Sequence, residues 1–99
     1  MSEQTDAIDV TVCEEIKAER VRQQREERWS HEHDDLHERG ELADAAAFYA
    51  SVRNIADLWP WDVDFIRKHP RRRQLVIAAA LIVAEIERID RAEKEHDDE

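Results

Sequence analysis

The run "RRRQLVIAAALIVAEIERIDRAEKE", residues 71–95, follows Pro70 and contains neither glycine nor a further proline. Pro70 suits the first turn of a helix, because its fixed φ is helical and its missing N–H would be unpaired there. One set of apolar residues steps by four, three, four and three positions, as along a heptad repeat. This heptad seam consists of Leu75, Ala79, Ile82, Ile86 and Ile89. We predict one long C-terminal helix.

The first half of this helix is apolar on its other faces as well, through Val76, Ile77, Leu81 and Val83. A helix that is apolar all round must be buried all round. A chain of 99 residues offers too few other helices to surround it. We therefore expect a homo-oligomer, a dimer or larger.

A second predicted helix begins at Thr11, where Thr11 and Glu14 have the spacing of a capping box. It runs to about Trp29. Its apolar stripe is thin and consists of Val12, Ile16 and, less strictly spaced, Val21. Such a stripe does not hold a helix alone, so this helix must lie across other helices or another subunit.

A third predicted helix begins between Asp34 and Glu38 and continues to about Val52. One face of it is then formed by Leu42, Ala45, Ala46, Tyr49 and Val52, and its alanines permit close approach of another helix. Gly40 is interpreted as a weak first turn, about 1 kcal/mol less favourable than alanine. The predicted fold class is thus all-α, a three-helix antiparallel arrangement with a long C-terminal core helix, assembled as a homo-oligomeric helical bundle. Residues 10–93 form a single helical domain between a disordered segment, 1–9, and a disordered acidic tail, 94–99.

The charge of the chain limits its partners. Charged residues make up 40% of the sequence and the net charge is −10, which argues against non-specific binding to nucleic acid or to an anionic membrane. The longest apolar run, residues 75–84, is too short to span a bilayer, and no signal peptide is visible. The single cysteine, Cys13, excludes an internal disulfide and has no neighbouring base to make it a nucleophile. We expect a cytoplasmic protein.

Two patterns are candidate metal sites. His33 and His37 are four residues apart, as metal-binding histidines on a helix are. Glu38, Glu41 and Asp44 continue at steps of three and form an acidic stripe able to bind Mg²⁺. The alternative is a solvated helix start whose acids complement the helix dipole.

Arg71, Arg72 and Arg73 predict a phosphate site, because guanidinium groups would there join the free N–H groups of a helix N-terminus. The alternative is neutralisation by nearby acids. Trp59 and Trp61 in the connector, residues 53–70, either cover the core or a neighbouring subunit, or stack on a base. Tyr49 is a third candidate for stacking.

Four motifs carry a resemblance to known proteins: "EIKAERVRQQREERWSHEHDD" (15–35), "GELADAAAFYA" (40–50), "LWPWD" (58–62) and "RRRQLVIAAALIVAEIERIDRA" (71–92). The chain resembles a group of small helical proteins common in bacteriophage and prophage genomes. More distantly, it is similar to the MazG-like all-α nucleotide pyrophosphohydrolases. In those enzymes an E-x-x-E pair on one helix and an E-x-x-D pair on the next hold Mg²⁺ against a nucleoside triphosphate.

The resemblance maps only in part onto this chain. Glu38 and Glu41 match the first acidic pair, but Arg72, Arg73 and Gln74 stand where the second is expected. Glu87 and Asp90 have E-x-x-D spacing and follow the apolar run instead. Exchange of metal-holding acids for arginine would convert a metal-plus-phosphate site into a direct phosphate site.

The expected function is that of a phage-encoded, oligomeric, non-catalytic protein that binds a nucleotide or another phosphate ligand. As the resemblance implies, it would sequester a nucleotide signal of host defence. One alternative is a Mg²⁺-dependent nucleotide pyrophosphohydrolase. The other is an acidic helical inhibitor of a host protein.

Overall fold

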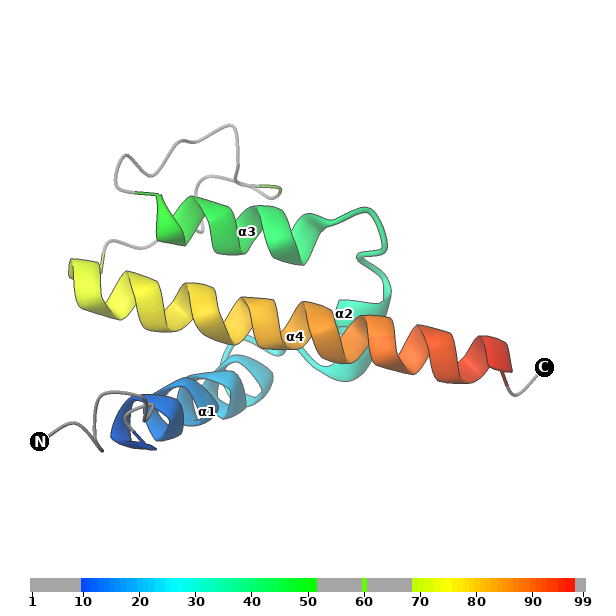
Figure 1. Ribbon diagram of the computed structural model, residues 1–99. Helices are drawn as coiled ribbons and strands as arrows, with labels where there is room; N and C mark the ends of the chain where they lie inside the picture. Colours follow the sequence, from blue (N-terminus) through cyan, green and yellow to red (C-terminus); the bar gives the residue numbers. More distant parts are fainter. Residues whose placement is uncertain (1–9, 52–59, 61–68, 98–99) are drawn as a thin grey trace, which may run out of the picture.

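The computed structural model describes residues 10–51, 60 and 69–97, and the regular structure within them is helical. The helices are α1 (Val10–Arg25), α2 (His31–Asp35), α3 (Glu41–Ala50) and α4 (Arg71–Asp97). The long helix α4 is the centre of the arrangement, and α1, α2 and α3 all pack against it (Figure 1). The predicted all-α class with a long C-terminal core helix is confirmed.

The apolar core lies between α3 and α4. It is formed by residues that are at most 5% exposed: Leu42, Ala45, Ala46, Phe48, Tyr49, Ile77, Ala78, Leu81 and Ala84. The alanines on both helices allow the two backbones to approach closely. The side chain of Trp29 packs against the edge of this core from the segment between α1 and α2.

The three longer helices alternate in direction. The start of α4 lies beside the end of α3, because Arg71 reaches the backbone carbonyl groups of Tyr49, Ala50 and Ser51. Helix α1 runs in the same general sense as α4 (Figure 1). This is the order of directions expected for the predicted antiparallel arrangement.

The helix predicted to begin between Asp34 and Glu38 begins only at Glu41, so its predicted start was wrong. A short helix, α2, precedes it, and the link between the two ends at Gly40 with φ +90°, a left-handed conformation that favours glycine. Gly40 is the N-cap of α3 rather than a weak turn inside one helix. The extra helix α2 begins after Ser30, whose hydroxyl accepts a hydrogen bond from the His33 N–H at 3.2 Å.

Two helix ends also differ from the predicted ones. Helix α1 ends at Arg25, before Trp29, and Arg28 adopts φ +61° where the chain turns towards α2. Helix α4 continues to Asp97, beyond the end predicted for the helical domain. The predicted disordered segment 1–9 lies outside the described residues. None of the helices in the described ranges has the length and apolar character needed to cross a membrane.

Candidate functional site

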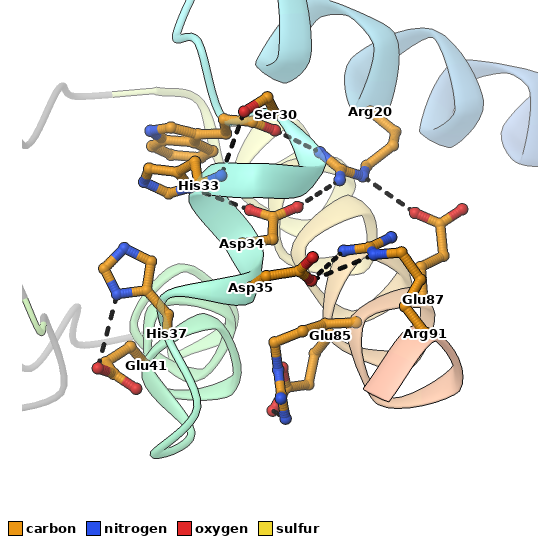
Figure 2. A network of polar contacts seen from close by, with 12 residues as sticks. Arg20, Ser30, His33, Asp34, Asp35, His37, Glu41, Glu85, Glu87 and Arg91 are labelled. Carbon is orange, nitrogen blue, oxygen red and sulfur yellow. Dashed lines mark hydrogen bonds and ion pairs between the residues drawn. The ribbon is translucent and has the colours of Figure 1, made fainter. Parts of the chain in front are cut away.

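A buried ion pair joins α1 to α2. Asp34 is fully buried and Arg20 is 6% exposed. The guanidinium Nη2 of Arg20 donates a hydrogen bond to Oδ2 of Asp34 at 2.5 Å, as Figure 2 shows. The same guanidinium donates to the carbonyl oxygen of Trp29 at 3.3 Å and lies 3.5 Å from Oε1 of Glu87 on α4. Arg20 therefore connects α1, α2 and α4.

A second buried polar cluster surrounds Glu19, which is 1% exposed. Its carboxylate accepts hydrogen bonds from Arg22 at 2.8 and 3.0 Å, from the side-chain amide of Gln23 at 3.0 Å, and from Arg73 of α4. Burial by itself raises the pKa of Glu19. The hydrogen bonds from Arg22 and Gln23 and the charges of Arg22 and Arg73 outweigh burial and lower it. Glu19 is therefore a buried carboxylate that stays ionised.

Gln23 is fully buried, and its Oε1 has no hydrogen-bond donor in the part of the chain that the structure describes. The other end of its amide is satisfied by Glu19. Glu19, Arg20 and Gln23 were not singled out from the sequence, although a signal exists. Continuing the spacing of Val12 and Ile16 along α1 leads to this same face, which turns from apolar to polar as it approaches α2.

The structure does bring His33 and His37 together, as predicted. Their ring centroids are 4.6 Å apart in an edge arrangement, and the ring of His33 stacks on Trp29 at 6.1 Å. Nδ1 of His33 lies 3.1 Å from Asp34 Oδ1, and Nδ1 of His37 lies 3.5 Å from Glu41 Oε2 (Figure 2). Each ring is thus paired with a different carboxylate.

The carboxylates of the predicted acidic stripe, Glu38, Glu41 and Asp44, do not come together around one point. Glu41 accepts a hydrogen bond from the Arg39 N–H at 2.7 Å, and hydrogen bonds from its own backbone and from Arg39 lower its pKa. Glu38 is exposed near Arg88, and Asp44 is exposed on α3. Within residues 10–51, 60 and 69–97, no group of three or more His, Cys, Asp or Glu side chains is arranged to hold a metal ion.

The three arginines at the start of α4 point to three different partners. Arg71 donates to the carbonyl oxygens at the end of α3, the shortest bond being 2.7 Å to Ala50. Arg72 donates two hydrogen bonds to the carboxylate of Glu15, one from each Nη atom, at 2.8 and 2.6 Å. Arg73 turns inward to Glu19. Arg71 and Arg72 are exposed, so of the predicted phosphate-binding group these two remain accessible.

Of the three residues predicted to stack on a base, one is described by the structure. Tyr49 is 5% exposed and packs edge-on against Phe48 at 5.4 Å, so its ring belongs to the core. Trp59 and Trp61 lie outside the described residues.

The heptad seam of α4 is turned outward. Leu75, Ile82, Ile86 and Ile89 are 45, 49, 53 and 39% exposed. The helix instead presents Ile77, Ala78, Leu81 and Ala84 to α3. Next to the seam, Val83 of α4 and Cys13, Ile16 and Val21 of α1 line a groove of about 490 Å³. Helix α4 therefore carries a row of exposed aliphatic side chains beside this groove.

Comparisons with family models, with curated proteins and with solved structures found no match for this chain.

Proposed function

We propose that this protein is a self-associating helical binding protein, and that the heptad seam of α4 is its self-association surface. One observation carries the proposal: four large aliphatic side chains at heptad spacing are each about 40 to 50% exposed in the single chain. Scattered apolar residues on a surface are ordinary, but a contiguous apolar stripe marks an interaction site.

The energetics favour coverage of this stripe. Full burial of a leucine or isoleucine side chain contributes about 1.5–3 kcal/mol, so covering the exposed half of each contributes roughly 1 kcal/mol. Ala79 lies within the same stripe and is partly buried. Its small side chain leaves room for a large one from a second helix.

The test compares two charge substitutions by light scattering coupled to size-exclusion chromatography. Ile82→Glu places a carboxylate in the middle of the seam. The loss of roughly 1 kcal/mol from each of two copies exceeds the 1.4 kcal/mol that changes an equilibrium constant tenfold, so association should weaken at least tenfold. Ala47→Glu, on the exposed side of α3, adds the same charge away from the seam and should leave the mass unchanged. A monomeric mass for the unsubstituted protein, or equal effects of the two variants, would contradict the proposal.

A second candidate function is binding of a nucleotide or another phosphate ligand without turnover. The observation that favours it is the exposed, bidentate ion pair between Arg72 and Glu15. The side chain of Arg72 is 65% exposed and that of Glu15 is 39% exposed. An exposed ion pair contributes little stability, and a phosphate is a better partner for the guanidinium fork than a carboxylate is. A phosphate group could therefore displace Glu15, with Arg71 beside it.

A nucleotide panel, read for both melting temperature and product, tests this candidate. Stabilisation without turnover, lost in Arg72→Ala and kept in Arg25→Ala, supports it. Mg²⁺-dependent turnover lost in Glu41→Gln supports a pyrophosphohydrolase instead. If neither effect occurs and a host protein is captured, the acidic inhibitor is favoured. Sequestration of a host defence nucleotide by a phage protein in the bacterial cytoplasm is the corresponding biological proposal, and it derives from the resemblance.

A further inference from the structure

The charged side chains of α4 are unevenly distributed along the helix. Its first turn carries Arg71, Arg72 and Arg73. Its last part, residues 85–97, carries six acidic residues against three lysines and arginines. Ion pairs within the described residues neutralise Arg72 and Arg73 through Glu15 and Glu19, and Arg88 and Arg91 through Glu85 and Asp35. Arg71 donates to carbonyl oxygens and keeps its positive charge at the start of α4. At the other end of the helix, Asp90, Glu93, Glu95 and Asp97 outnumber Lys94. A second copy therefore meets a weakly basic end and a strongly acidic end.

The two ends of the heptad seam lie equally far from its middle residue, Ile82. Leu75 lies seven residues before Ile82 and Ile89 lies seven after it, which spans about 21 Å at the rise of an α-helix. Reversing the helix about Ile82 therefore brings Leu75 opposite Ile89. Ala79 then comes opposite Glu85, one residue from Ile86, so that a small side chain lies near a large one.

We propose that two copies associate through α4 in antiparallel orientation, about a twofold axis near Ile82. This inference rests on the proposed self-association and adds its geometry. Antiparallel packing places the arginine turn of one copy beside the acidic end of the other. Parallel packing would place the two arginine turns together and the two acidic ends together, and like charges at an interface are unfavourable.

The apolar surface of the seam extends to the groove between α4 and α1. Val83 follows Ile82 directly in α4 and lines the groove together with Ile16 and Val21 of α1. Val21 and Val83 are each 36% exposed. The apolar surface therefore continues from the seam onto α1, and a twofold axis gives each copy the same covering.

Disulfide formation between copies tests the orientation. The parent variant is Cys13→Ser, which removes the exposed native thiol. Single cysteines then replace Leu75 or Ile89, two exposed positions whose replacement spares the α3–α4 core. Under mild oxidation, a mixture of the Leu75→Cys and Ile89→Cys proteins should form mixed dimers, whereas each protein alone should form few. Ala47→Cys, on α3, is the control for random collision.

The outcomes distinguish the antiparallel orientation of the two copies from their self-association. Efficient cross-linking of Leu75→Cys with itself and of Ile89→Cys with itself, in protein that sediments as a dimer, overturns the antiparallel inference and leaves the proposed self-association standing. Sedimentation of the parent protein as a monomer overturns both. Preferential mixed cross-linking, above the Ala47→Cys background, supports the inference.

Discussion

Removal of Asp34 tests whether the buried ion pair holds the helices together. In Asp34→Ala the guanidinium of Arg20 loses its 2.5 Å partner, yet it stays at 6% exposure between α1, α2 and α4. Breaking a buried pair by removing one partner costs about 3–5 kcal/mol, because a charge is left uncompensated. Glu87, 3.5 Å away and half exposed, compensates only weakly. We therefore expect a loss of about 4 kcal/mol in the free energy of unfolding.

Urea denaturation at one fixed protein concentration measures this loss, because association makes stability depend on concentration. With a slope of about 2 kcal/mol per molar urea, 4 kcal/mol lowers the midpoint by about 2 M. Asp44→Ala, an exposed aspartate on α3, is the matched control and should change the free energy by no more than about 0.5 kcal/mol.

A double variant keeps the test decisive even if Asp34→Ala fails to fold. Arg20→Met combined with Asp34→Leu removes both charges and refills the space with apolar side chains. Such replacements of buried pairs are often close to neutral. We expect the double variant to recover most of the lost stability. A loss below about 1 kcal/mol in Asp34→Ala, or a double variant no more stable than the single one, would contradict the stabilising role given to this ion pair.

Three further predictions concern the core, the α2–α3 turn and the acid response. Leu81→Ala removes a fully buried side chain between α3 and α4 and should lower the free energy of unfolding, measured by urea denaturation, by about 3 kcal/mol. A loss under about 1 kcal/mol would contradict the position of Leu81 in the core. Gly40→Ala should cost about 1–2 kcal/mol through its φ of +90° alone, because no atom lies within 4 Å of the added Cβ; an unchanged midpoint would show that the turn tolerates side chains. The folded-state pKa of Glu19 lies below its ordinary value of 4.5, so the stability it contributes is present above that value and is lost as the pH falls below it. The urea midpoint should therefore fall between about pH 5 and pH 3, and less steeply in Glu19→Gln; an equal slope in the variant would contradict this assignment.

The sequence predicted the main features of the fold where one residue pattern dominates. Pro70 and the uninterrupted run after it predicted α4, and the spacing of Leu42, Ala45, Ala46 and Tyr49 predicted the face of α3 that is buried. It did not predict the break at Gly40, because a glycine is compatible both with a weak helical turn and with a left-handed cap. Only the φ angle decides between the two.

The buried polar residues were harder to predict. Nothing in the local sequence separates Asp34 from Asp35, yet the first is fully buried against Arg20, and the second pairs with Arg91 near the surface. Burial of a charge depends on where three helices meet, which is a property of the tertiary structure. For the same reason the three arginines of α4 looked like one anion site in the sequence, whereas the fold gives each a different partner.

We propose that a second copy covers the heptad seam of α4. Sedimentation equilibrium of the unsubstituted protein across a range of micromolar concentrations tests it most directly. The chain has a mass of 11.7 kDa, and we expect a reversible approach to about twice that mass or more as the concentration rises. A folded species that keeps the mass of one chain throughout the range would contradict it.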